Sequence, residues 1–288
     1  MLIAFAFAGC GTPPPPAPTP AVPVFEPHKL ESPAGLHNLI AVNDWLSTGS
    51  EPEGDDGFRS LSALRFRTII SVDGARPDVE LAKKHGLRYL HFPIGYNAIP
   101  QERVMQIAKA LQMLPRPIYL HCHHGKHRGP AAAVAALRCL DGTCTAAKAA
   151  EFLELAGIDP RYAELYAIVE AQAQVSLGTL ERLPDEFPAT AEISDFVSTM
   201  VKIDLVWSRL QKSKSPADAI LLHEYYRELL RHPGKQPTGL TALLKAAETE
   251  ANNVAEAKDE AAKDTAIAAT GQLCSQCHKS YRDKTTPK

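Results

Sequence analysis

The chain has 288 residues, a formal net charge of −2 at pH 7 and a sequence pI of about 6.6. This near-neutral balance gives no broad positive surface, so the composition argues against a nucleic-acid partner. The length is sufficient for two hydrophobic cores even when the first 33 residues are set aside.

The N-terminus consists of eight apolar residues followed by Gly9 and Cys10. Such a stretch is too short to span a bilayer. Residues 1–10 resemble the end of a bacterial lipoprotein signal, although no basic residue precedes the apolar run. The resemblance implies a lipid anchor on Cys10 and export to the periplasmic side of a membrane. Residues 11–33 are rich in proline, which predicts an extended spacer.

Strand-like and helix-like segments alternate between residues 34 and 178. Strand patterns cover residues 36–42, 68–73, 88–93 and 117–122. Helix patterns cover residues 55–64, 77–85, 101–114, 128–139, 145–156 and 160–175. The alternation predicts an α/β domain with a central, largely parallel sheet flanked by helices. Residues 178–188 are expected to join it to the next domain, and Cys139 and Cys144 either form a disulfide or remain thiols.

A turn between the strand at 117–122 and the helix from 128 is the most informative part of the chain. It reads His121-Cys122-His123-His124-Gly125-Lys126-His127-Arg128-Gly129, with a thiol six positions before a guanidinium. The free N–H groups and the dipole of a helix N-terminus favour a bound phosphate and a thiolate. We therefore expect a lowered pKa for the Cys122 thiol. Arg128 can hold two phosphate oxygens in a planar fork.

These residues resemble the HCxxGxxR signature of the protein tyrosine and dual-specificity phosphatase superfamily, and the resemblance extends over about residues 36–175. It implies that Cys122 attacks phosphorus to form a phosphocysteine and that Arg128 steadies the phosphoryl group. We expect His121 to be a buried hydrogen-bonding partner of the turn. The phosphate would be cradled by the residues that follow the cysteine, namely His123, His124, Gly125, Lys126, His127 and Arg128.

The chain departs from the family pattern at two positions. The upstream loop, residues 91–100, has no carboxylate where the family commonly has an acid Asp, and Asn97 is the best positional match. An amide cannot protonate a leaving alkoxide, so we expect a slow enzyme that favours phenolic phosphates. Asp73 reads more simply as the cap of a strand-end turn. Gly129 stands where the family usually has Ser or Thr, which predicts slow breakdown of the phosphocysteine.

The same histidine-rich turn has a competing interpretation as a metal-binding tract. Lys126 and Arg128 would place positive charge against a divalent ion, so we expect no metal in this domain. We expect His123, His124 and His127 to line the mouth of the pocket and to add positive charge below about pH 6.5. A Walker loop is excluded because His127, rather than Ser or Thr, follows Gly125-Lys126.

From residue 189 onward the pattern is helical, with expected helices at 191–211, 217–231, 240–263 and 265–282. The segment Cys274-Ser275-Gln276-Cys277-His278 is CxxCH, the spacing that attaches haem through two thioethers. A late CxxCH on the last of four helices is similar to the cytochrome c′ and c-556 family. The resemblance implies an all-α four-helix-bundle haem domain over residues 189–288. In it, Cys274 and Cys277 would carry haem c, and His278 would be the fifth iron ligand.

The sixth position of the iron stays open at this point. Met200 lies in the first expected helix of the bundle, where six-coordinate members of the family place a methionine, but a methionine at helical spacing is often core filler. His223 and His232 are competing candidates. A vacant position that binds small gases is the remaining alternative.

Taken together, the motifs predict an exported, lipid-anchored phosphatase fused to a haem domain with a redox or sensing role. The substrate would be a phosphorylated protein or a small aryl phosphate, and the haem would imply a redox partner. The alternative is an electron-transfer cytochrome whose first domain binds phosphate with little or no turnover.

Overall fold

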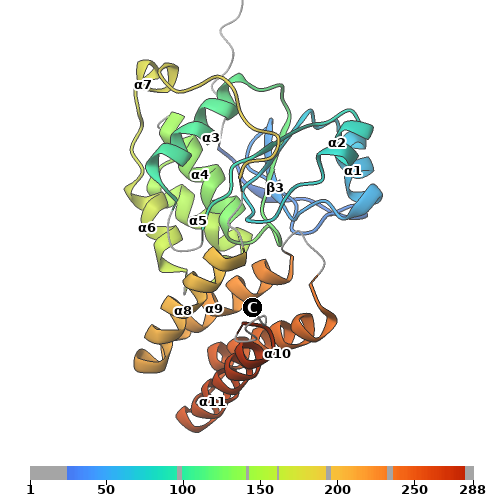
Figure 1. The fold of residues 1–288 in the computed structure, drawn as a ribbon. Coiled ribbons are helices and arrows are strands. Elements are labelled where there is room, and N and C mark those ends of the chain that lie inside the picture. The colour runs from blue at the N-terminus through green and yellow to red at the C-terminus, as the bar shows by residue number, and fades with distance from the viewer. Residues whose placement is uncertain are drawn as a thin grey trace, which may run out of the picture.

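The computed structural model describes residues 25–95, 99–140, 143–160, 162–192, 196–231 and 236–282. It shows an α/β part, with an all-helical part below it in Figure 1. The expected lipid-bearing Cys10, most of the spacer, the acid-loop residue Asn97 and the ligand candidate His232 lie outside the described residues.

The sheet has six strands in the order β1-β2-β3-β6-β4-β5. Their bounds are β1 (His28–Lys29), β2 (Ile40–Ala41), β3 (Leu46–Gly49), β4 (Thr68–Ser71), β5 (Arg88–His91) and β6 (Ile118–His121). The four strands β3, β6, β4 and β5 are parallel, whereas β1 and β2 add antiparallel pairs at one edge. The prediction of a largely parallel sheet is thus confirmed for these four strands. Because β6 lies between β3 and β4, the turn after it leaves the carboxyl edge of the sheet at its centre, where ligands of open α/β sheets commonly bind.

The strand predicted over residues 36–42 is wrong in its extent and in its role. Only Ile40–Ala41 is a strand, and the neighbour of β6 is β3, which the sequence pattern did not reveal. Asn38 has a left-handed backbone with φ of 49°, which ends any extended run there. All four residues of β3 are buried, so its sequence LSTG shows no alternation between apolar and polar positions.

Helices cover both faces of the sheet (Figure 1). On one face, α1 (Gly54–Ala63) and α2 (Val79–Lys84) pack on a small core that includes Phe58, Tyr89 and Tyr119. The other face carries α3 (Gln101–Met113), α4 (Arg128–Leu140), α5 (Ala146–Ala156) and α6 (Ala163–Ala171). A short helix, α7 (Leu177–Glu181), lies in the segment expected to be a plain connection. Cys139 and Cys144 are buried, and they form no disulfide with each other.

The C-terminal part contains α8 (Phe196–Ser213), α9 (Pro216–Leu230), α10 (Thr238–Glu256) and α11 (Glu260–Cys277), and a π-helical turn, His278–Arg282, follows. Helix α9 packs against α8 and α10, and α10 packs against α11. The predicted break near residue 264 is wrong, because Asp259 caps α11 by accepting from the Ala262 N–H at 2.8 Å. None of the described helices is both long and apolar enough to cross a membrane.

Candidate active site

The turn after β6 depends on a glycine. Gly125 has φ of +68°, and a Cβ atom there would lie 2.2 Å from the carbonyl carbon of Gly49 in β3. No larger residue fits this approach without moving the strand. The Asn38 side chain donates to the Gly125 carbonyl oxygen at 2.9 Å. The turn is therefore fixed against the neighbouring strand.

Cys122 lies at the base of the turn and is only 3% exposed. The backbone N–H groups of His127 and Gly129 donate hydrogen bonds to its sulfur. His121 is buried beside it, with Nε2 2.6 Å from the Tyr89 hydroxyl and Nδ1 3.3 Å from the Cys122 carbonyl oxygen. The sulfur therefore faces main-chain amides, which is the arrangement a thiolate nucleophile needs.

The expectation of a lowered thiol pKa is wrong for this arrangement. Burial raises the pKa of Cys122, and the positive charge of Arg128 and the two backbone N–H groups oppose that effect without reversing it. The nearby carboxylate of Asp73 raises the pKa further. The conformation seen here therefore favours the thiol of Cys122 over the thiolate.

Arg128 is fully buried, and carboxylates surround its guanidinium. Nη2 donates to Asp73 Oδ1 at 3.1 Å, and Nη1 donates to Glu228 Oε1 at 2.8 Å and to the Ile94 carbonyl oxygen at 3.3 Å. Arg231 donates to both carboxylate oxygens of Asp73, at 2.8 and 2.9 Å. The charges of the two arginines hold the pKa of Asp73 far below its usual range, against the opposing effect of burial.

Only part of this cluster is predictable from the sequence. Asp73 accepts from the Ala75 N–H at 3.2 Å, as the turn prediction requires, but its ion pairs were missed. Glu228 and Arg231, both contributed by the segment around α9, were missed entirely. A signal was present in the sequence, because Glu224, Arg227, Glu228 and Arg231 follow the i, i+3, i+4, i+7 spacing of one helix face.

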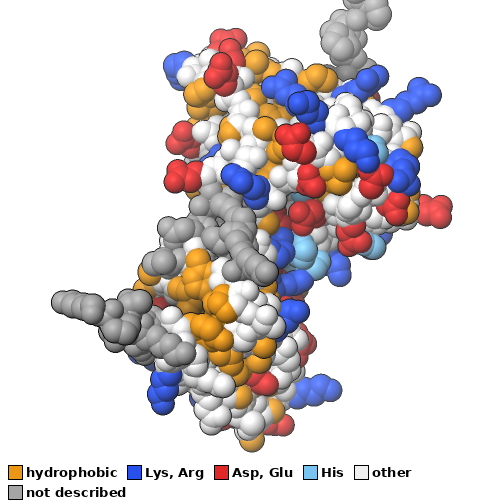
Figure 2. Space-filling model, turned by 45° about the vertical axis from the view of Figure 1, so that its right-hand side comes forward, with side chains coloured by type: hydrophobic (Ala, Val, Ile, Leu, Met, Phe, Trp, Pro, Cys, Tyr) orange, Lys and Arg blue, Asp and Glu red, His pale blue; other side chains and the backbone are white. Residues whose placement is uncertain are grey.

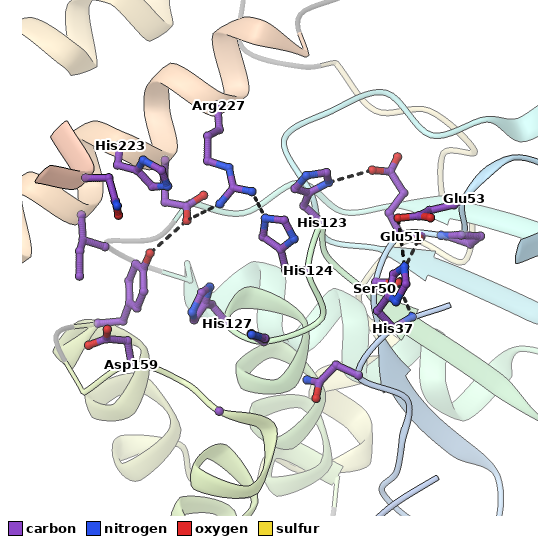
Figure 3. Close-up of a pocket in the computed structure, with 18 of the residues that line it drawn as sticks. His37, Ser50, Glu51, Glu53, His123, His124, His127, Asp159, His223 and Arg227 are labelled. Carbon is purple, nitrogen blue, oxygen red and sulfur yellow. Dashed lines mark hydrogen bonds and ion pairs between the residues drawn. The ribbon is translucent and has the colours of Figure 1, made fainter. Parts of the chain in front are cut away.

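The histidines of the turn line a cleft of about 1110 Å³ between the α/β part and α9 (Figure 3). His123 Nδ1 is 3.2 Å from Glu51 Oε2, and the rings of His127 and Tyr162 lie 4.4 Å apart. His124 is hydrogen-bonded to the guanidinium of Arg227, and Lys126 also lines the cleft. Neither Cys122 nor Arg128 is among the described residues that line this cleft. The structure thus brings the histidines to the mouth of the cleft, with the cysteine and arginine buried behind them.

The expected positive charge on these histidines below pH 6.5 is not found for two of them. Burial lowers the pKa of His124 to about 4, and Arg227 adds to this effect. Burial likewise lowers the pKa of His127 to about 4, and the charge of Arg128 contributes. Both rings are therefore neutral in the folded protein at pH 5 to 6.

We expect the protein to lose roughly 1–3 kcal/mol of unfolding free energy between pH 7 and pH 5, because the unfolded chain binds protons near pH 6.5 that folded His124 and His127 bind only near pH 4. Urea unfolding at both pH values measures this loss. A variant with His124→Gln and His127→Gln should show a smaller loss, whereas His28→Gln, at an exposed position in β1, serves as the control. Equal losses in the double variant and the unmodified protein would contradict the assignment.

One group of potential metal ligands was also identified among the described residues. Ligand atoms of Glu51, Asp73 and His123 lie within 4.8 Å of one another. Arg231 Nη1 is 2.8 Å from Asp73 Oδ2 and 3.8 Å from Glu51 Oε2, so a guanidinium already provides the cation for these carboxylates. This arrangement does not favour the metal-binding interpretation of the histidine-rich turn.

The CxxCH residues lie at the end of α11 and in the π-helical turn. Cys274 and Cys277 are partly exposed free thiols. The Tyr226 hydroxyl of α9 is 3.4 Å from the Cys274 sulfur. The thiols are therefore accessible for attachment of a prosthetic group, and they border a side chain of α9.

Comparison with known proteins gives similarities confined to part of the chain. No family model matches. The "Inositol diphosphatase DSP2" of rice, Oryza sativa subsp. japonica, is 26% identical over 143 residues, which is 45% of this chain and 69% of that protein. Among solved structures, P. aeruginosa TpbA is 20% identical with a TM-score of 0.42, over 52% of this chain and 95% of TpbA.

Two further solved structures show similarity of the same order. TpbA in complex with pTyr is 18% identical with a TM-score of 0.43, over 57% of this chain and 96% of that chain. Tk-PTP in the active form is 16% identical with a TM-score of 0.35, over 48% of this chain and 97% of that chain. The similarities to these solved structures each extend over about half of this chain.

Proposed function

We propose that the α/β domain is a cysteine-dependent phosphatase. The observation that carries the proposal is the position of the Cys122 sulfur. It accepts hydrogen bonds from the backbone N–H groups of His127 and Gly129, in the turn that leads to the buried Arg128. In the reaction, Cys122 Sγ forms a bond to phosphorus while the ester oxygen leaves. Water then cleaves the phosphorus–sulfur bond and releases phosphate. The similarity to the rice inositol diphosphatase supports this class of reaction.

The preferred substrate is proposed to be an aryl phosphate, such as phosphotyrosine, because the loop at 91–100 offers no carboxylate to protonate a leaving alkoxide. General-acid assistance is usually worth about 10²–10⁴ in rate, and a phenolate needs less of it than an alkoxide does. We expect kcat/KM for phosphotyrosine to exceed that for phosphoserine by roughly 10² or more. Release of inorganic phosphate from matched tyrosine and serine phosphopeptides tests this. Equal rates on the two peptides would show that an acid group assists both.

A second proposed function, for the helical domain, is covalent binding of haem c. Lys214 at the end of α8 forms an ion pair with Asp264 near the start of α11, with Nζ 2.6 Å from Oδ1. Trp207 lies seven residues before Lys214, and Gly271 lies seven residues after Asp264. These two residues are also in contact, since a Cβ atom on Gly271 would lie 3.4 Å from the Trp207 ring. The two helices are therefore antiparallel at these contacts, which lie about two helical turns apart on each helix.

If the same spacing continues for seven more residues on each helix, Met200 would pair with His278. This spacing supports the proposal that His278 and Met200 would bind the iron of a haem that Cys274 and Cys277 would hold through thioethers. The competing candidate His223 instead lines the interdomain cleft, with Nδ1 3.2 Å from the Glu248 carbonyl oxygen. Apolar side chains gather on the surface of the helical part in Figure 2. Val201 and Leu205 of α8 are among its exposed large hydrophobic residues.

When bound, haem would supply a redox-active iron. We propose that the helical domain uses it to exchange electrons with a redox partner or to sense a small ligand. The proposal includes export, because the cytochrome resemblance implies that the thioethers form outside the cytoplasm. A lipid anchor on Cys10 would then hold the protein at the membrane.

We expect the purified protein to carry covalent haem that survives denaturation and gives the absorption bands of a c-type cytochrome after reduction. Replacing Cys274 and Cys277 together with alanine should remove all covalent haem, whereas Cys139→Ala should retain it. Met200→Ala should convert a six-coordinate spectrum into one that changes on addition of carbon monoxide. The mass of the intact protein, measured after expression with a haem-attachment system, checks this result. A mass that corresponds to the polypeptide without haem would contradict the proposal.

A further inference from the structure

One helix of the C-terminal part contacts the phosphate-binding turn through several polar side chains. From α9, Glu224 accepts from the Tyr162 hydroxyl at 3.2 Å, and Arg227 is hydrogen-bonded to His124. Glu228 accepts from Arg128 at 2.8 Å, and Arg231, at the C-cap of α9, forms the paired bonds with Asp73. We call these four contacts the α9 clasp. They all come from one face of the helix and all end on the loops around the candidate active site.

Glu228 is the member of the clasp that acts on the anion site itself. Glu228 Oε1 accepts a hydrogen bond from Nη1 of Arg128. A guanidinium binds phosphate through the same N–H groups. The carboxylate lies close against the backbone of Gly74, where a Cβ would be 2.8 Å from Glu228 Oε1. Only 15% of the Glu228 side chain is exposed, so the pair is shielded from solvent. An anion must displace this carboxylate to reach the arginine.

The charges around Arg128 also disfavour the binding of phosphate. Arg128 and Arg231 bring two guanidinium groups, and Asp73, Glu228 and Glu51, whose Oε2 is 3.8 Å from Arg231 Nη1, bring three carboxyl groups, so the cluster has no net positive charge to offer a phosphate dianion. Without Glu228 the same cluster would contain one carboxyl group fewer, and Arg128 would lose a competitor for its Nη1 N–H. Charges in a shielded site interact strongly, so removal of this carboxylate would favour the binding of an anion.

Cys122 and Arg128 are both shielded from solvent in this conformation. Cys122 is 3% exposed and Arg128 is fully buried, whereas the cleft in front of them is lined by residues of the turn and of α9. The face of α9 that forms the clasp thus covers the site. The same helix contacts Cys274 through the hydroxyl of Tyr226, so α9 touches both cysteine motifs.

We propose that α9 is a built-in inhibitory element: Glu228 takes the place of phosphate on Arg128, and an anion binds at Cys122 only after α9 withdraws. The inference extends the proposed phosphatase function by naming how that site is regulated. Its physical basis is competition between two anions for one guanidinium. The apparent affinity of the site for phosphate is then reduced by the fraction of molecules in which the clasp is open.

The test uses the full chain and two readouts besides turnover. Glu228→Gln keeps the shape of the side chain and removes its charge, and Glu228→Asp keeps the charge but shortens the reach to Arg128. For each, calorimetry measures the Kd of inorganic phosphate, and peptide mass spectrometry measures the rate at which iodoacetamide modifies Cys122. Glu164→Gln, at an exposed position of α6, is the matched control.

We expect Glu228→Gln to tighten phosphate binding by roughly tenfold or more and to accelerate alkylation of Cys122 by a similar factor. Glu228→Asp should show a smaller change in the same direction, so it carries the test if the Gln variant fails to fold. Phosphatase kcat/KM should rise with phosphate affinity, chiefly through a lower KM.

Two results would overturn the proposal. The first is a phosphate Kd and an alkylation rate that stay unchanged in both variants. The second is a fall in kcat with unchanged alkylation, which would make Glu228 a participant in the reaction rather than an inhibitor. If phosphate binding tightens and Cys122 becomes reactive while no variant releases phosphate, the clasp stands and the phosphatase proposal fails.

Discussion

Replacing Cys122 by serine is expected to reduce phosphate release from aryl phosphates by at least about 10⁴-fold, because the hydroxyl is a far weaker nucleophile than a thiolate and no covalent intermediate forms. Inorganic phosphate released per enzyme per minute is the measurement. The variant should fold normally, since the two side chains have similar shape and the His127 and Gly129 N–H groups find an oxygen in place of the sulfur.

Cys139→Ser is the matched control for this variant. Cys139 is a buried thiol near the C-terminal end of α4, at the opposite end of the helix from Arg128. Its replacement should leave turnover within a few-fold of the unmodified protein. Activity that persists in Cys122→Ser would mean that another group is the nucleophile. Phosphate binding without release in either protein would favour the alternative, a cytochrome with a docking domain.

The second large effect is expected at Arg128. Arg128→Lys keeps a positive charge but loses the planar fork, so kcat/KM should fall by about 10²–10³. Arg138→Lys is the matched control, because Arg138 lies on the same helix and donates to the carbonyl oxygens of Cys144 and Gln172, away from the site. Steady-state kinetics on an aryl phosphate separates the two variants. A decrease in kcat/KM of less than fivefold for Arg128→Lys would mean that Arg128 does not contact the transferring phosphoryl group.

Removing the charge of Arg128 altogether should also destabilise the fold. Arg128→Met leaves the carboxylates of Asp73 and Glu228 buried without one of their partners, and breaking a buried pair in this way costs about 3–5 kcal/mol. Urea denaturation measures this loss. Adding Glu228→Gln to the same chain should recover part of it, because the Glu228 carboxylate that lost Arg128 is then absent, whereas Asp73 still pairs with Arg231. No recovery would show that Glu228 does not interact with Arg128 in solution.

Prediction from sequence succeeded where the governing interactions are local. The turn from Cys122 to Arg128 follows from a strand, a glycine and a helix start that are adjacent in the chain, and the structure has each of them. Prediction failed at β3, where burial on both faces removes the alternation that identifies a strand. It also failed at the boundary of α10 and α11, where the cap at Asp259 was overlooked.

The same distinction applies to the candidate site. A low pKa for Cys122 was a reasonable expectation from a helix N-terminus and an arginine. The structure reverses its direction because burial dominates and because the Asp73 carboxylate raises the pKa further. Glu228 lies 100 residues after Arg128, so no local pattern could pair them.

The amino-acid sequence by itself determined the two chemical motifs and their order, because Cys122 to Arg128 and Cys274 to His278 are each set by spacing along a single turn or helix. Only the tertiary structure decided which groups face them. The packing of α9 against the carboxyl edge of the sheet places Glu228 on Arg128, and it places the Tyr226 hydroxyl 3.4 Å from the Cys274 sulfur. Both outcomes depend on contacts between segments far apart in the chain, and such contacts are fixed by the packing of whole helices.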